Sequence, residues 1–156
     1  MKKILAMVAF VAMALTASAQ EMVTYDCEKF SVQHPKEYAD VVDSWSNVVN
    51  EWKKDDNHYL SVWPDEYSDA TLDNLTTWGS MMKQDFEGKD EGWKVDEPVI
   101  NGKYLTIRMT AGDVVQYYYI IVGDGLNFEG RMKFLISEEE KYKPIFDKIL
   151  ASCKAK

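Results

Sequence analysis

The most restrictive feature of the sequence is the stretch at residues 114–122, which reads VVQYYYIIV. Successive residues of a strand point to opposite faces of a sheet, so a strand with one solvated face alternates apolar and polar residues. This stretch instead carries apolar or aromatic residues at both sets of positions. It predicts a central strand that is covered on both faces, and therefore a fold that supplies two covering layers.

Short segments that contain glycine separate this stretch from the strand-like segments around it. Segments of this length join antiparallel neighbours, because a parallel neighbour needs a crossover of about a dozen residues or more. Two further strands are predicted upstream, at residues 28–34 and 39–45. The second half of the chain predicts four antiparallel strands, at residues 93–99, 104–110, 114–122 and 126–136, with turns at Asn101-Gly102, Ala111-Gly112-Asp113 and Gly123-Asp124-Gly125.

A hairpin is predicted between residues 47–54 and 57–63, with Asp55-Asp56 as its two-residue loop. The loop fixes the register, and this register brings three aromatic and two polar side chains to one face. Such a face can stack on a sugar ring or hold a cationic or peptide ligand, and it can equally be core beneath a helix. The five residues of this predicted ligand-contact face are Trp52, Tyr59, Trp63, Asn50 and Ser61.

Two helices are predicted from apolar residues that recur at helical spacing. The first can be capped by Asp69 or Thr71, and Gly88 lies close behind its expected end. Its apolar stripe is Leu72, Leu75, Trp78, Met82 and Phe86.

The second helix lies near the end of the chain. Ser137-x-x-Glu140 matches a capping box, and the main part of the helix is expected to begin close to Pro144. Its apolar stripe is Tyr142, Ile145, Phe146, Ile149, Leu150 and Cys153. The order of strands, helix, strands and helix predicts an α+β fold in which helices cover both faces of one antiparallel sheet, an α/β/α sandwich.

The first nineteen residues predict a secretory signal peptide. Lys2 and Lys3 precede an apolar run at residues 4–15, and Ala17-Ser18-Ala19 forms a small-x-small site with cleavage after Ala19. The alternative is an uncleaved membrane anchor, but the run is shorter than the roughly 20 residues that span a bilayer. We expect a single domain at residues 20–156, periplasmic or secreted, with no stable membrane insertion after cleavage.

Cleavage makes an acidic chain more acidic. The full sequence has 18 basic and 26 acidic residues, and loss of two lysines leaves a net charge of −10. Such a chain repels nucleic acid, so no nucleic-acid partner is predicted. Cys27 and Cys153 can form a disulfide in an oxidising compartment, and the alternative is two separate buried thiols.

Four segments of the sequence resemble the PsbP-like fold family. They are FSVQHPKEY, TLDNLTTWGSMMKQDF, the segment that runs from INGKYLTIRMT through the tyrosine-rich strand to GRMKF, and YKPIFDKILASC. The family includes the extrinsic PsbP protein of photosystem II, a eukaryotic Ran-binding import factor and many small exported bacterial proteins. The resemblance implies the fold and a binding or accessory role, and it carries over no residue of a partner-contacting site.

The sequence contains no recognisable catalytic, cofactor or metal motif. His34 and His58 lie on different predicted strands without ligand spacing, and no nucleophile elbow, phosphate loop or calcium loop is present. We therefore expect no catalytic, cofactor-binding or metal-binding residues, and a role in binding an envelope protein or a small ligand. The alternative is an envelope hydrolase with paired carboxylates, which would need two carboxyl groups about 5–10 Å apart in a concave pocket.

Overall fold

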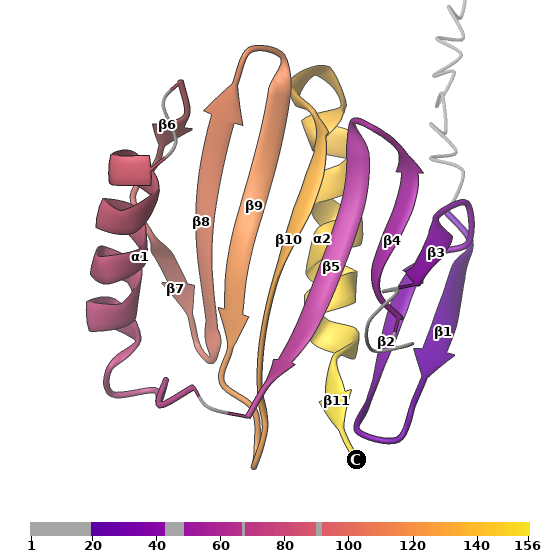
Figure 1. Ribbon diagram of the computed structural model, residues 1–156, viewed down its shortest axis with the longest axis horizontal. Coiled ribbons are helices and arrows are strands. Elements are labelled where there is room, and N and C mark those ends of the chain that lie inside the picture. The colour runs from indigo at the N-terminus through magenta and orange to yellow at the C-terminus, as the bar shows by residue number, and fades with distance from the viewer. Residues whose placement is uncertain (1–19, 43–48, 67, 90–91) are drawn as a thin grey trace, which may run out of the picture.

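The computed structural model describes residues 20–42, 49–66, 68–89 and 92–156. These residues form a mixed α+β structure with two α-helices and strands that pair antiparallel (Figure 1). The predicted α+β class is confirmed. The predicted signal peptide at residues 1–19 lies outside the described residues.

The larger sheet of the described chain has eight strands and brings distant parts of the sequence together. Its order is β3-β4-β5-β10-β9-β8-β6, and β7 pairs with β8 beside this path. The pairing of β10 with β5 joins the first hairpin to the later strands. The strands are β3 (Ala39–Val42), β4 (Val49–Asp55), β5 (His58–Asp65), β6 (Lys94–Val95), β7 (Val99–Asn101), β8 (Tyr104–Ala111), β9 (Val114–Ile121) and β10 (Asn127–Leu135).

A smaller sheet joins the two ends of the described chain. It contains β1 (Met22–Asp26), β2 (Phe30–Pro35) and β11 (Lys154–Ala155), with β2 in the middle. Phe30 and Val32 of β2 are buried in the same apolar cluster as the inner face of the last helix. The small sheet therefore packs against the same apolar cluster as the last helix. The sequence did not predict this contribution of the small sheet.

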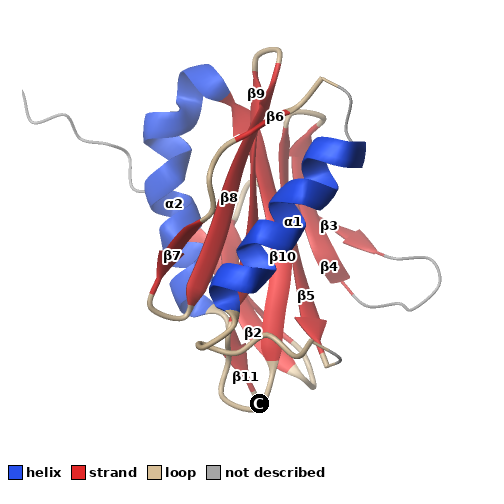
Figure 2. Cartoon of the chain, turned by 90° about the vertical axis from the view of Figure 1, so that its left-hand side faces the viewer, coloured by secondary structure: helices blue, strands red, loops and turns tan. Residues whose placement is uncertain are grey.

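Strand β9 is buried on both of its faces, as predicted. Val115 and Tyr119 belong to the apolar cluster that includes Phe146 and Ile149 of α2 (Glu139–Ser152). Tyr118 and Ile120 alternate with them and belong to a second cluster, which includes Leu75 and Phe86 of α1 (Leu75–Lys89). Because neighbouring strand residues point to opposite faces, each cluster takes one face of β9. Figure 2 shows the two helices and the strands of the larger sheet, turned by 90° from the view of Figure 1.

Helix α1 begins later than its apolar pattern suggested. Leu72 lies before the helix and is 62% exposed, whereas Leu75 and Phe86 are buried. The helix is preceded by Asn74, whose side chain accepts from the Thr71 backbone N–H and donates to the Asp69 carbonyl. The expected cap at Asp69 or Thr71 is therefore wrong, and the helix runs through Gly88 to Lys89.

The start of α2 also differs from the prediction. A 3-10 turn at Ile136–Glu138 leads directly into the helix, and Pro144 lies inside it. The residue at the N-cap is Glu138, and it makes no side-chain capping hydrogen bond, so the predicted capping box does not form. Proline has no backbone N–H, so the carbonyl four residues earlier loses its helical hydrogen bond. Because Pro144 is exposed, that carbonyl lies on the solvated side of the helix.

The first hairpin forms, but its register differs by one residue from the prediction. Asp55 pairs with His58, so the loop is Asp56-Asn57, with a bulge between Lys53 and Asp55. The cause is the Asp55 side chain, which accepts from the backbone N–H groups of Asn57 at 2.8 Å and His58 at 2.9 Å and so closes its own turn. A one-residue slip exchanges the faces of all side chains on one strand relative to the other.

No helix of the described chain has the length and apolar character needed to cross a membrane.

Candidate functional site

The shifted register divides the predicted ligand-contact face between two sides of the sheet. Trp52 pairs with Leu60 and is fully buried in the cluster with α2, where it stacks on His34 at 5.0 Å between ring centroids. Its inclusion in a ligand-contact face is therefore wrong. Asn50 lies at an irregularity between β3 and β4, and its Oδ1 atom is buried without a hydrogen-bond partner in the described structure.

The other three residues of that face stay together on the opposite side of β5. Tyr59, Ser61 and Trp63 alternate along this strand, and Glu51 of β4 pairs with Ser61. On the next strand, Arg131 pairs with Ser61 and Glu129 pairs with Trp63. These residues line a groove of about 300 Å³, which we call the sheet groove: Glu51, Tyr59, Ser61, Trp63, Tyr118, Glu129, Gly130 and Arg131.

The sheet groove is open because α1 covers only part of its side of the sheet. The helix packs on β8, β6 and β7, at the far edge from β4 and β5. Phe86 of α1 packs edge-on against the groove residue Tyr118, with 5.1 Å between the ring centroids. The lining residues themselves come from β4, β5, β9 and β10.

Two hydrogen bonds hold Ser61 in place at the floor of the sheet groove. The Ser61 hydroxyl is fully buried and accepts a hydrogen bond from the Arg131 backbone N–H at 3.1 Å. From the other face of the sheet, the Tyr119 hydroxyl donates to the Ser61 carbonyl at 2.6 Å. A side chain at Gly130 would overlap both that carbonyl and the Tyr119 hydroxyl. Because Gly130 has no side chain, the Tyr119 hydroxyl can approach β5 from the opposite face of the sheet and form this hydrogen bond.

Two tyrosines bind the carboxylates of the sheet groove. The Tyr59 hydroxyl donates to Glu51 Oε1 at 3.1 Å, and the Tyr118 hydroxyl donates to Glu129 Oε2 at 2.9 Å. Burial raises the pKa of both tyrosines, so both phenols stay protonated and act as donors at neutral pH. Neither glutamate has an ion-pair partner among the residues that the structure describes.

Arg131 is the cation of the sheet groove. Its guanidinium lies over the Phe86 ring, 5.9 Å from the centroid. It forms no ion pair within the described chain, although Glu129 lies two residues away on the same strand. Glu129 is instead bound to Tyr118 and Arg131 to Phe86, so a positive and a negative group face the same groove without neutralising one another.

Comparison with solved structures identifies the fold. The solution structure of cyanobacterial PsbP (CyanoP) from Synechocystis superposes with a TM-score of 0.63 over 88% of this chain and 94% of that chain, at 17% sequence identity. The chain has the PsbP-like fold. The fold that the sequence resemblance implied is therefore confirmed.

Other comparisons add no functional assignment. A protein of unknown function from Pseudomonas aeruginosa aligns over 81% of this chain and 91% of its own, with a TM-score of 0.48 and 13% identity. No family model and no curated protein matches the sequence.

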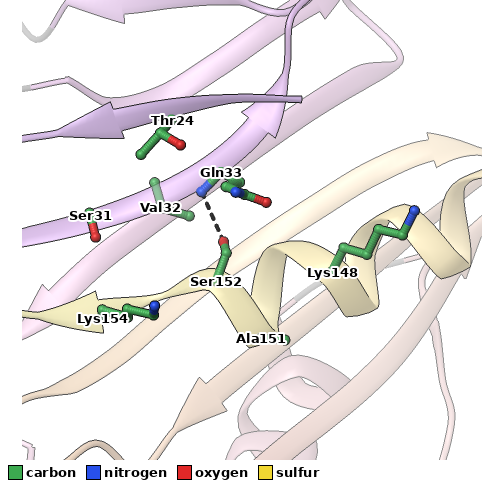
Figure 3. Close-up of a pocket in the computed structure, with 8 residues that line it drawn as sticks. All are labelled: Thr24, Ser31, Val32, Gln33, Lys148, Ala151, Ser152 and Lys154. Atoms are coloured by element: carbon green, nitrogen blue, oxygen red, sulfur yellow. Dashed lines mark hydrogen bonds between the residues drawn. The ribbon is translucent and has the colours of Figure 1, made fainter. Parts of the chain in front are cut away.

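A second pocket lies between the small sheet and the end of α2 (Figure 3). Its volume is about 400 Å³, and the Ser152 hydroxyl at its centre accepts from the Gln33 backbone N–H at 2.8 Å. Lys148 and Lys154 lie on either side of Ser152 in this view. Both lysines are exposed, and the pocket has no aromatic wall. It is a less enclosed candidate than the sheet groove.

A cluster of titratable side chains elsewhere connects β8, β9 and α2. Arg108 of β8 binds Glu139 of α2 through two nitrogens, at 2.7 and 2.8 Å, and Asp96 through a third, at 3.0 Å. Tyr117 donates to the same glutamate at 2.6 Å. The two arginine contacts hold the pKa of Glu139 below its usual value. Among the described residues, no group of three or more His, Cys, Asp or Glu side chains is placed to hold a metal ion.

Both cysteines are free in the described structure, so the predicted Cys27–Cys153 disulfide is not formed. Each thiol contacts a carbonyl close to it in sequence: Cys27 Sγ lies 3.4 Å from the Phe30 oxygen, and Cys153 Sγ lies 3.4 Å from the Ile149 oxygen. Burial raises the pKa of the Cys153 thiol to about 12. The thiols are separate, as in the alternative of two buried thiols, but only Cys153 is buried and Cys27 is partly exposed.

The sequence did not predict that Glu51, Tyr118, Glu129 and Arg131 line the groove. A signal for two of them was present, because Glu129 and Arg131 alternate with the buried residues Phe128 and Met132 along β10. The alternation indicates that the two charged residues share one face. It does not indicate that β10 pairs with β5, and that pairing places them beside Tyr59 and Trp63.

Proposed function

We propose that this chain is an exported PsbP-like domain, residues 20–156, that binds a protein or a small ligand through the sheet groove and catalyses no reaction. The periplasm or the cell exterior is the proposed location, after cleavage of the signal peptide behind Ala19. We propose neither a nucleic-acid partner nor stable membrane insertion. The net charge of −8 before cleavage supports the first exclusion, since nucleic acid is also negatively charged.

The proposal rests on one observation: the sheet groove combines half-buried aromatic side chains with charged groups that form no ion pairs in the described chain. Tyr59 and Trp63 are half-buried aromatic residues beside a fully buried Ser61. The charged groups around them have no ion-pair partners in the described chain. Concave sites with apolar walls and a few oriented polar groups are the usual form of small-ligand sites, and aromatic residues and arginine often supply the binding energy of interfaces.

The fold supports this role by exposing one part of the sheet. The two apolar clusters favour the finer architecture expected from the sequence, an antiparallel sheet with a helix on each face. In this α/β/α arrangement α1 is too narrow to cover β4, β5 and β10, and the uncovered part is the sheet groove.

Retention of components from a native envelope extract tests the proposal. The immobilised chain is compared with W63A, which removes a wall of the sheet groove, and with L72A, which removes an exposed apolar side chain outside it. We expect a small molecule or protein that the wild type and L72A retain and W63A loses. Equal retention by W63A, or no retained component at all, would contradict binding through the groove.

The alternative is an envelope hydrolase that uses Glu51 and Glu129, because both line the same cavity. The register separates their backbones by two strand spacings and two residues, roughly 12 Å, so only converging side chains could work as a pair. Each carboxylate instead accepts a hydrogen bond from a different tyrosine. Hydrolysis of envelope glycans or esters that is lost in both E51Q and E129Q would favour this alternative.

A further inference from the structure

We propose that the sheet groove takes a zwitterionic ligand of dipeptide size, with its free carboxylate on Arg131 and its free ammonium group at Glu129 or Glu51. This inference rests on the proposed function and names the chemistry of the ligand.

Arg131 supplies the site for the carboxylate. A guanidinium presents paired N–H donors that match the two oxygens of a carboxylate, and such pairs are stronger than neutral hydrogen bonds. In the described chain this guanidinium has an aromatic neighbour, Phe86, and no carboxylate partner. Stacking on the ring restrains the arginine without using its donors.

The glutamates supply the site for the ammonium group. Each has one oxygen that accepts from a tyrosine, Oε1 in Glu51 and Oε2 in Glu129, and the other oxygen has no partner in the described structure. Tyr59 and Trp63 lie on the same face, and their rings attract a cation. A positively charged amine therefore meets both a carboxylate and aromatic rings.

The spacing of the charges determines the size of the ligand. Glu129 and Arg131 are two residues apart on one strand, so their backbones are separated by roughly 7 Å. Two residues of an extended peptide also span about 7 Å. The groove volume of about 300 Å³ lies at the lower end of small-ligand sites. A ligand with only one charged end would leave either Arg131 or both glutamates without a charged partner.

The inference is tested by calorimetric titration of the protein with alanyl-alanine, its N-acetyl form and its C-terminal amide. We expect each blocked form to bind at least about tenfold more weakly, which is the effect of losing one hydrogen-bonded charge contact. R131Q should weaken the free and the acetylated dipeptide and leave the amide unchanged. E129Q combined with E51Q should weaken the free dipeptide and the amide and leave the acetylated form unchanged.

Two substitutions of charged surface residues serve as matched controls. K148Q removes another exposed cation without an ion pair in the described structure, at the pocket of Figure 3, and E28Q removes an exposed carboxylate. Both should bind as the wild type does. Equal binding of all three dipeptides would overturn the zwitterion inference and leave a binding role intact. Absence of binding to all three would also overturn it, and the extract experiment would then decide the proposed function by itself.

Discussion

The imidazole of His58 and the carboxylate of Glu138 are in contact, with Nε2 2.6 Å from Oε2, although the residues are 80 positions apart. The other ring nitrogen, Nδ1, lies 2.8 Å from Asp55 Oδ1. This buried histidine therefore connects the turn of the first hairpin to the start of α2.

Replacement of His58 by phenylalanine should destabilise the fold by about 1–3 kcal/mol, because it removes both contacts from a buried position at similar volume. Urea unfolding measures this change as a lower midpoint with an unchanged slope. E140Q, on the exposed side of the same helix, serves as the control. A loss below 0.5 kcal/mol in H58F, on the order of an ordinary surface substitution, would mean that the contact does not stabilise the fold.

The pH dependence of stability should contain a contribution from His34. Burial lowers the pKa of this histidine, so the unfolded chain binds its proton more readily than the folded chain does. Stability should therefore fall as the pH drops below about 6.5, the pKa of an unfolded histidine, until the folded pKa is passed. Urea unfolding of the wild type and H34F between pH 5 and pH 8 isolates this effect. The difference between the two proteins should change across this interval, and a constant difference would refute the assignment.

Asp55 and Glu139 should affect stability in a separate, more acidic interval. Hydrogen bonds from His58 lower the pKa of Asp55, and those from Arg108 lower the pKa of Glu139. A lowered carboxyl pKa stabilises the fold above the unfolded value of about 4, and this stabilisation is lost as the pH falls through the folded value. The destabilisation caused by E139Q should therefore be full at pH 7 and shrink below about pH 4 in the same unfolding assay. An unchanged effect of E139Q from pH 7 to pH 2 would contradict the ion pair with Arg108.

The two tryptophans of the first hairpin should behave in opposite ways. W52A removes a fully buried ring that packs on His34 and Tyr25 and should cost about 3–5 kcal/mol. W63A removes a half-buried ring from the sheet groove and should cost much less while abolishing ligand retention. Thermal unfolding measures the first effect and the extract experiment the second. Comparable destabilisation by both variants would instead support the register predicted from the sequence, in which both rings lie on one face.

The thiols should react at different rates. Cys153 is 6% exposed and burial raises its pKa to about 12, whereas Cys27 is partly exposed. Iodoacetamide should alkylate Cys27 in the folded protein and reach Cys153 only in denaturant, because the thiolate is the reactive form. Mass spectrometry locates each adduct. Recovery of the protein from an oxidising compartment with neither thiol alkylated, even in denaturant without a reductant, would indicate the disulfide that the structure lacks.

The sequence was most informative where periodicity alone decides the structure. Burial of β9 on both faces followed from residues 114–122, since no alternation was present to suggest a solvated side. A turn that contains Gly102 likewise joins β7 to β8, although its loop is Gly102-Lys103, one residue later than predicted, and the strand predicted at residues 93–99 is divided into β6 and β7. These features depend on neighbours in the chain, which a single sequence displays directly.

The candidate site was less predictable because it depends on one turn and one long-range pairing. The Asp55 carboxylate accepts hydrogen bonds within the turn, and the loop lies one residue later than predicted. In this register Trp52 points into the core. The pairing of β10 with β5 then brings Glu129 and Arg131 to Tyr59 and Trp63. Both effects require interatomic geometry that residue spacing does not encode. Only three of the five residues of the predicted face, Tyr59, Ser61 and Trp63, therefore line the sheet groove.

We propose that the uncovered part of the sheet beside α1 binds a ligand. Amide chemical-shift mapping of the ¹⁵N-labelled protein, with the small-molecule fraction of an envelope extract as the probe, tests it most directly. We expect concentration-dependent shifts at Ser61 and Arg131 and at the indole N–H of Trp63, with Gln33 and Ser152 of the second pocket unchanged. Shifts that cluster around Gln33 and Ser152, or a groove that stays unperturbed at saturating extract, would contradict it.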